Sequence, residues 1–234
     1  MKEKMGFGLN MSMISPIHAE LCLCWGTLGV TSSIYVMMGE SLRLKRYVMK
    51  INSKKYIVFD LETTGLYSRR GDRVIEIGAV SIKDGTINDE FHSLVNVPRK
   101  ISKGAQQVHG ITSEMLEGKP TPEQVFPLFK TFIDDAILVA HNAKFDMAFL
   151  RAEFHRLGLG LAARYKCTLA MSRKFFPQLP DHRLETVARY ILDDGIVTDQ
   201  HHRALEDARL AAEICIKMLE GAAKAKIVKG TMAY

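Results

Sequence analysis

The sequence predicts an α/β fold, in which helices flank a central mixed sheet made of an antiparallel meander and parallel strands. Two observations carry this prediction. Three segments between residues 56 and 95 have the composition of strands and are joined by short turns. Farther along, a short apolar segment at 136–140 is followed at once by a helical segment, an order that is typical of α/β folds.

The first predicted strand covers residues 56–61, where successive side chains alternate between two faces. Residues 73–82 are apolar on both faces, as expected for a central strand. A Lys-Asp-Gly-Thr turn then leads to a third strand at 87–95, which completes the antiparallel meander. Further short strands are predicted at 136–140 and 165–168.

Helices are predicted at six places from apolar periodicity and from residues that start or stop helices. Gly158 ends one of them, and Asp181 is expected to cap the amino end of another. The six segments are 112–117, 123–133, 144–157, 169–176, 184–192 and 203–220.

The 234 residues are 47% hydrophobic and 25% charged, which is typical of a globular protein with one substantial core. We expect an amino-terminal leader of uncertain role (1–52), a folded domain (53–222) and a short basic tail that frays (223–234). The leader contains an uncharged run at 21–38 that just reaches membrane-spanning length but is diluted by small polar residues. A membrane anchor, a family-specific extension and a wrongly assigned start, with Met49 as the true one, are all open, and we favour the last two.

The charge and the cysteines limit the class of protein. A formal net charge of +6 is compatible with a polyanionic partner such as nucleic acid, but it does not single one out. The four cysteines form no Cys-x-x-Cys pair, so we expect free thiols in a reducing cytoplasm. They are Cys22, Cys24, Cys167 and Cys215.

Carboxylates occur where structured elements should present them. Asp60 and Glu62 lie two residues apart on a predicted strand, so both leave the same face just before a Thr-Thr-Gly turn. A solvated edge strand would explain them as well, although strands disfavour Asp. Asp146 falls in the first turn of a predicted helix, where the helix dipole alone would favour it.

His202 and Asp207 are five residues apart, a spacing that does not place them on one helical face. They converge only if His202 precedes the helix, and the polar segment 193–201 supports this arrangement. A histidine beside a metal-bound phosphate could deprotonate water, because its ordinary pKa is near neutrality. Because His201 is adjacent, the spacing does not decide which of the two histidines meets Asp207. With hard oxygen ligands nearby, the sequence suggests a phosphodiesterase site with paired divalent cations.

Four segments in this order resemble the DEDD exonucleases of the ribonuclease H-like fold, histidine subtype, and in particular the proofreading epsilon subunits of bacterial DNA polymerase III. The segments are 60–65 (DLETTG), 107–112 (QVHGIT), 141–146 (HNAKFD) and 202–207 (HRALED). The resemblance covers about residues 54 to 220 and implies a ribonuclease H-like fold for the exonuclease domain at 53–222.

The resemblance also implies roles for individual residues. Four carboxylates would hold two Mg²⁺ or Mn²⁺ ions about 3.5–4 Å apart, one activating the attacking water and the other stabilising the leaving oxygen. These ligands are Asp60, Glu62, Asp146 and Asp207. His202, rather than His201, would be the general base. The expected substrate-binding residues are Thr63, Thr64, Gly65, Leu66, His109, His141 and Asn142.

The implied function is a 3′–5′ exonuclease that hydrolyses single-stranded or frayed DNA ends and releases nucleoside 5′-monophosphates. Two alternatives are an exoribonuclease of the oligoribonuclease or ribonuclease T type and a non-catalytic nucleic-acid-binding module. The Thr63–Thr64 pair favours the polymerase-associated branch. The expected partners are DNA or RNA 3′ ends and a DNA polymerase catalytic subunit; we expect a cytoplasmic protein without a membrane attachment.

Overall fold

The computed structural model describes residues 54–192 and 202–231. Five strands form one sheet in the order β3-β2-β1-β4-β5. β1 pairs antiparallel with β2, and β2 pairs antiparallel with β3, whereas β4 and β5 continue the sheet in parallel. The predicted mixed sheet is therefore confirmed. The strands are β1 (Tyr56–Thr63), β2 (Val74–Lys83), β3 (Thr86–Leu94), β4 (Ile137–Ala140) and β5 (Tyr165–Cys167).

The helices occupy the predicted places, with two additions and one longer end. The helices are η2 (Ser68–Arg70), α2 (Lys103–His109), α3 (Ser113–Leu116), α4 (Pro122–Ile133), α5 (Ala143–Arg156), α6 (Thr168–Phe175), α7 (Leu184–Ile191) and α8 (Ala204–Thr231). Apolar periodicity did not reveal η2 or α2. The helix predicted at 203–220 is longer in the structure, in which α8 continues to Thr231.

The cap of α7 was predicted wrongly. Arg183, and not Asp181, occupies the N-cap position. The Asp181 carboxylate instead accepts the backbone N–H of Arg183 at 3.0 Å. This bond spans two residues and closes a turn just before the helix, which is the other local bond that Asp commonly makes.

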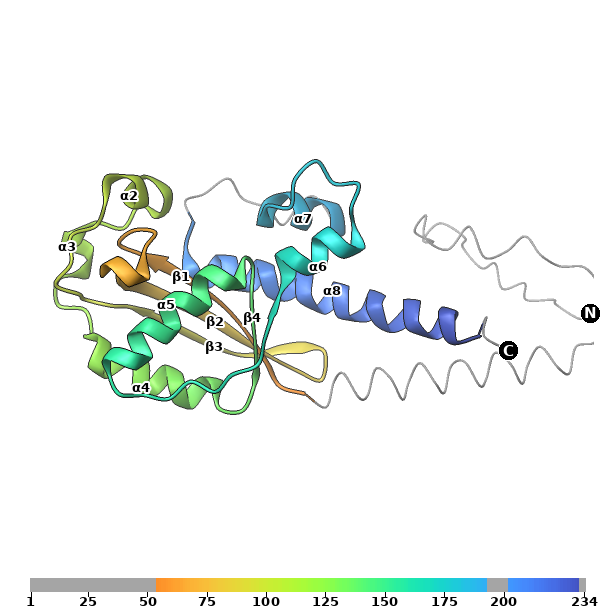
Figure 1. Cartoon of the computed structure of the whole chain (residues 1–234), viewed down its shortest axis with the longest axis horizontal. Helices are drawn as coiled ribbons and strands as arrows, with labels where there is room; N and C mark the ends of the chain where they lie inside the picture. The colour runs from red at the N-terminus through yellow and green to blue at the C-terminus, as the bar shows by residue number, and fades with distance from the viewer. Residues whose placement is uncertain (1–53, 193–201, 232–234) are drawn as a thin grey trace, which may run out of the picture. The chain divides into compact units, whose positions relative to one another are not determined.

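Helices cover both faces of the sheet, as Figure 1 shows, and each face has its own core. Ile57, Phe59 and Leu61 of β1 pack with α4 and α5, whereas Tyr56 and Val58 pack with α7 and α8. β1 is therefore buried on both faces, and its polar residues lie near its carboxyl end.

The start of α8 lies unusually close to β2. Gly78 is paired with Asp60 across the two strands, and a Cβ atom at Gly78 would overlap the backbone of Ala204 and Leu205. The absence of a side chain therefore lets the first turn of α8 sit directly on the sheet beside Asp60.

Two sequence predictions concern the membrane and the thiols. Within the described ranges, no helix is both long and apolar enough to cross a membrane, and the run 21–38 lies outside them. Cys167 and Cys215 are free thiols, as predicted, and Cys22 and Cys24 lie outside the described residues.

Candidate active site

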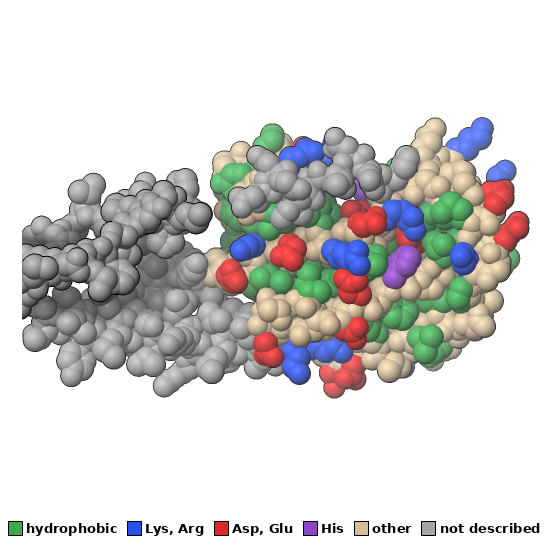
Figure 2. All heavy atoms as spheres, turned by 180° about the vertical axis from the view of Figure 1, so that it is seen from behind, with side chains coloured by type: hydrophobic (Ala, Val, Ile, Leu, Met, Phe, Trp, Pro, Cys, Tyr) green, Lys and Arg blue, Asp and Glu red, His purple; other side chains and the backbone are tan. Residues whose placement is uncertain are grey.

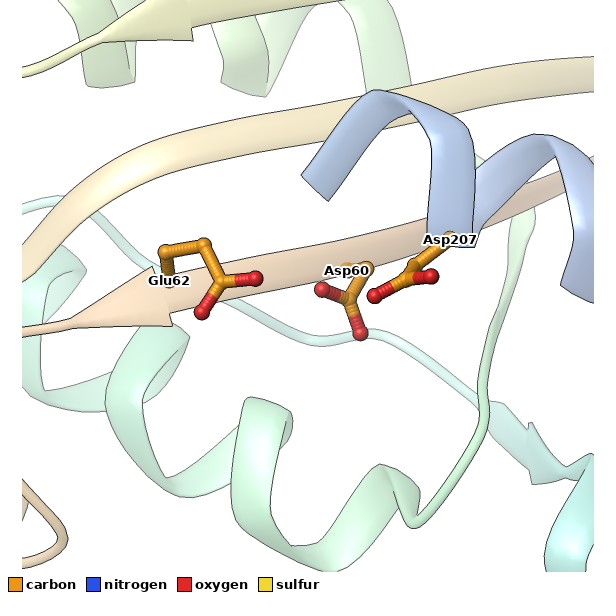
Figure 3. Close-up of side chains that lie close together, drawn as sticks. All are labelled: Asp60, Glu62 and Asp207. Atoms are coloured by element: carbon orange, nitrogen blue, oxygen red, sulfur yellow. The ribbon is translucent and has the colours of Figure 1, made fainter. Parts of the chain in front are cut away.

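Three carboxylates converge where β1 meets the start of α8. Asp60 and Glu62 project from β1, and Asp207 comes from the first turns of α8 (Figure 3). Each residue offers one oxygen, and these oxygens all lie within 4.8 Å of one another. The predicted alternation along β1 and the close approach of α8 together produce this cluster.

The cluster is electrostatically unfavourable without a cation. Burial, together with the charges of Asp146, Glu62 and Asp207, raises the pKa of Asp60 well above its ordinary value. Burial and neighbouring carboxylates also raise the pKa of Glu62 to about 9. The pKa of Asp207 is raised as well, mainly by burial. Because a hard divalent cation binds oxygen ligands and offsets their repulsion, this donor set fits such an ion.

Asp146 is buried in the first turn of α5, as predicted, but its oxygens are not part of the three-oxygen cluster. Burial raises its pKa to about 8, and the backbone N–H groups of Asp146 and Leu61 oppose that shift. Its charge raises the pKa of both Asp60 and Glu62, so it is an electrostatic neighbour of the cluster.

His202 lies just before α8, which begins at Ala204, so the predicted break between loop and helix is confirmed. Its Nδ1 lies 3.1 Å from Oδ2 of Asp207. Because a carboxylate accepts, this contact places a proton on Nδ1 and leaves Nε2 as the proton acceptor of the neutral ring. Nε2 lies 3.9 Å from Oε1 of Glu185. His201 lies outside the described residues.

A cavity of about 480 Å³ opens beside these groups. Its wall combines predicted site residues with the start of α7, which was not predicted as part of the site. The lining residues are Asp60, His141, Arg183, Leu184, Glu185, His202 and Asp207. Arg183 brings a positive charge to a wall that otherwise carries three carboxylates, a suitable arrangement for a phosphate held beside metal ligands.

His141 ties two walls of the cavity together. Its Nε2 lies 2.8 Å from the carbonyl oxygen of His182 and therefore donates to it, while Nδ1 accepts the Thr168 hydroxyl at 3.0 Å. Burial lowers the pKa of His141 and favours this neutral ring. Both ring nitrogens are engaged, so His141 supports the site and does not supply a free base. Asn142, the N-cap of α5, adopts a left-handed conformation with φ 68°.

The residues that follow Glu62 form a tightly bonded turn. The Thr63 hydroxyl donates to the Gly65 carbonyl at 2.7 Å, and the Thr64 hydroxyl accepts the N–H of Arg73 at 3.0 Å. His109 Nε2 lies 3.3 Å from the Thr63 carbonyl. Leu66, by contrast, is 68% exposed. The turn is thus held by its own hydrogen bonds and by contacts from Arg73 and His109, and it exposes the apolar side chain of Leu66.

Sequence reasoning missed Glu76, a carboxylate that is fully buried in β2. It lies in the segment that was interpreted as apolar on both faces, and its partner across the sheet is Glu62. A charged residue inside an otherwise apolar central strand was the signal that could have revealed it.

The fold and the acidic cavity fit the expected class of protein, an enzyme that hydrolyses phosphodiester bonds. Comparison with protein-family models then gives the family: residues 57–215 match the exonuclease family RNase_T, and the chain belongs to that family. The predicted enzyme class and family are confirmed.

Relatives and solved structures agree with this assignment. The chain is 39% identical over 189 residues to the PolC-type DNA polymerase III of Thermotoga petrophila (80% of this chain, 14% of the relative). It is 40% identical over 164 residues to that of Clostridium perfringens (68% and 11%). It therefore spans about one eighth of the length of these relatives.

Exonuclease X, solved in complex with 5′ overhanging duplex DNA, has 27% identity and a TM-score of 0.58, with 71% of this chain and 92% of that chain covered. The zinc-bound complex of E. coli ExoI with single-stranded DNA has 16% identity and a TM-score of 0.62, with 76% and 42% covered, and shows the fold alone. The predicted ribonuclease H-like fold is confirmed.

Proposed function

We propose that this exonuclease removes nucleotides from the 3′ end of single-stranded or frayed DNA and releases nucleoside 5′-monophosphates. The observation that carries the proposal is the meeting of three carboxylates with the His202–Asp207 pair beside one cavity. DNA is supported as the substrate because the PolC-type relatives are DNA polymerases and exonuclease X was solved with DNA.

Asp60, Glu62 and Asp207, with Asp146 as the fourth ligand, would hold two Mg²⁺ or Mn²⁺ ions. When bound, such ions lower the pKa of a water ligand and offset the negative charge of the reacting phosphate. Three of these carboxylates already lie close together, and their pKa values are raised mainly by burial, with added repulsion from neighbouring carboxylates at Asp60 and Glu62, a cost that bound cations would offset.

His202 is the general base of this proposal. Asp207 accepts the Nδ1 proton, so Nε2 is left to take a proton from the attacking water. Glu185 near Nε2 would stabilise the imidazolium that results, and Arg183 would contact the phosphate. The histidine thus needs both its position before α8 and its carboxylate partner.

The turn after β1 would receive the terminal nucleotide. Leu66 is exposed for contact with a base, while Thr63, Thr64 and Gly65 shape the backbone beneath it. His109 would hold this turn through the Thr63 carbonyl, and His141 and Asn142 would support the opposite wall. In this proposal the buried residues of the turn shape the pocket, and the exposed Leu66 contacts the base.

A DNA polymerase catalytic subunit is the proposed protein partner, and the cytoplasm is the proposed location. Both proposals rest on the PolC-type relatives, which are themselves polymerases. A pull-down with the polymerase subunit from the same cell tests the first, and cell fractionation tests the second.

The decisive experiment is a nuclease assay on 3′-labelled single-stranded DNA, with the matching RNA in parallel, in Mg²⁺ or in EDTA. Wild type should shorten DNA only in Mg²⁺, and Asp60→Ala and His202→Ala should lose activity. Full activity of Asp60→Ala, or activity in EDTA, would refute the metal-dependent mechanism. Faster cleavage of RNA would refute the proposed substrate.

A further inference from the structure

We propose that the ion pair between the fully buried Glu76 and the partly exposed Arg203 is a positioning device, which fixes the start of α8 and thereby holds His202 and Asp207 against the carboxylates of β1. The inference rests on the function proposed above, since it concerns the same site. It assigns a role to a buried acid and to a basic residue that the chemistry itself does not use.

Glu76 collects donors from three different elements. Both of its oxygens lie 3.1 Å from Nε of Arg203, and Oε1 lies 2.6 Å from Nη2. The backbone N–H of Ala204 donates to Oε2 at 3.2 Å, and Nε2 of His92 on β3 lies 2.8 Å from Oε1. A side chain of β2 therefore binds the residue before α8 and the first residue of the helix at once.

The contacts keep Glu76 charged although it is fully buried. Burial alone would raise the pKa of Glu76, but the hydrogen bonds from Arg203, His92 and the Ala204 N–H lower it below its ordinary value. A carboxylate at the first N–H groups of a helix also interacts favourably with the helix dipole. Glu76 thus caps the amino end of α8 from β2, whereas an ordinary N-cap residue directly precedes its helix.

The placement of this cap links it to the catalytic residues. Arg203 directly follows His202, and its carbonyl accepts the N–H of Asp207 at 2.9 Å in the first helical turn. Glu76 is paired with Glu62 across β1 and β2, and Gly78 is paired with Asp60. The start of α8 lies on Gly78 and is bound by Glu76. Because these two residues are the strand partners of Asp60 and Glu62, they fix the position of the helix beside those carboxylates.

Arg203 also balances charge beside the cluster. Glu76 lies opposite Glu62 across β1 and β2, and Arg203 is the arginine that contacts Glu76. Loss of Arg203 would therefore leave a further carboxylate without its guanidinium next to the proposed metal ligands, in addition to freeing the start of α8. Both effects disfavour the arrangement that a cation and the His202 base require.

An ion pair between α8 and β3 offers a control. Arg209 forms a two-pronged contact with Glu90 of β3, with Nε 2.8 Å from Oε1, but both side chains are more than one third exposed. On the face shown in Figure 2, acidic and basic side chains are interspersed in this way. An exposed pair of this kind contributes little, whereas loss of Arg203 would leave the fully buried Glu76 without its charged partner, which is strongly destabilising.

The test uses the full chain with Arg203→Met, Arg203→Lys, the double variant Glu76→Met/Arg203→Met and the control Glu90→Gln. Titration calorimetry measures the Mn²⁺ affinity. Release of the label from 3′-labelled DNA gives kcat and KM, and thermal unfolding gives the stability. Replacing both partners by apolar residues leaves no unpaired charge at the buried Glu76 position, so the double variant separates folding from positioning.

We expect Arg203→Met to weaken Mn²⁺ binding and to lower kcat by about 10- to 100-fold each, the range typical of residues that orient metal ligands. The double variant should regain the melting temperature of wild type but not its kcat or Mn²⁺ affinity. Arg203→Lys should fall between wild type and Arg203→Met, and Glu90→Gln should match wild type.

A double variant with wild-type kcat and Mn²⁺ affinity would overturn the inference, as would single variants that change the melting temperature alone. A wild-type chain without metal-dependent nuclease activity would instead refute the proposed function. In that case the Mn²⁺ affinities of the same variants still decide whether Glu76 and Arg203 position the carboxylates.

Discussion

Without metal, the acidic cluster should make the folded protein less stable as the pH rises, and Glu62→Gln should remove the share of this effect that Glu62 contributes. The pKa of Glu62 is raised from its ordinary value of 4.5 to about 9 in the folded state. The folded protein therefore holds a proton that the unfolded chain releases above about pH 4.5. This contribution to stability is fully present below that pH and is lost as the pH rises toward 9.

The magnitude follows from proton linkage. Between pH 5 and pH 7 one such carboxyl lowers the free energy of unfolding by about 1.4 kcal/mol per pH unit, or about 2.7 kcal/mol in all. With about 2–4 °C per kcal/mol for a domain of this size, the melting temperature should fall by about 5–11 °C. Mg²⁺ at about 100 times its Kd should return about 2.7 kcal/mol.

The assay is thermal unfolding in EDTA at pH 5, 6 and 7, with wild type and Glu62→Gln side by side. Glutamine does not titrate, so Glu62→Gln should gain stability relative to wild type as the pH rises. Mg²⁺ should stabilise wild type more at pH 7 than at pH 5. A constant difference between the two proteins across this range would refute the reasoning.

The other predictions concern the cavity wall, the α8 contact, the base and the leader. Arg183→Ala should raise KM for DNA about 2- to 5-fold, which is the effect of losing an exposed ion pair, and should leave kcat nearly unchanged. A loss of kcat at constant KM in steady-state assays would contradict this role. Gly78→Ala should lower both the melting temperature and the Mn²⁺ affinity, because the added Cβ would overlap the start of α8. An unchanged Mn²⁺ affinity in calorimetry would argue against the close contact between Gly78 and α8. In single-turnover assays, Asp207→Asn/His202→Ala should be no slower than Asp207→Asn alone, and additive losses would show that the pair does not act as a unit. A chain that starts at Met49 should keep full exonuclease activity, since the family match begins at residue 57; loss of activity in a folded protein would give the leader a catalytic role.

Local patterns were sufficient for the strand that carries the first two carboxylates. Alternation along residues 56–62 places Asp60 and Glu62 on one face, and this inference needs no knowledge of neighbouring strands. The break before α8 was likewise visible, because the polar segment ends where the apolar helical stripe begins. A histidine just before the helix could therefore be expected to meet Asp207, but the choice of His202 over His201 came from the resemblance to the family.

Features that depend on register or on distant contacts could not be predicted in the same way. Glu76 becomes informative only when β2 is aligned with β1, which places it opposite Glu62. The cavity wall at Arg183 and Glu185 depends on how α7 packs on α8. α2 has no apolar stripe, and only its Ser102 cap and Gly110 stop marked it in the sequence.

The start of α8 brings one proposed metal ligand and the proposed base together. Asp207 lies among the clustered carboxylates and also accepts the Nδ1 proton of His202, which lies just before the helix, so the position of both depends on how α8 begins. Any shift of the start of α8 relative to Gly78 and Glu76 changes both functions together. Asp146, in contrast, is carried by α5 in the other layer. Substitutions that displace the start of α8 should therefore impair metal binding and proton transfer together, whereas substitutions that displace α5 should affect metal binding alone.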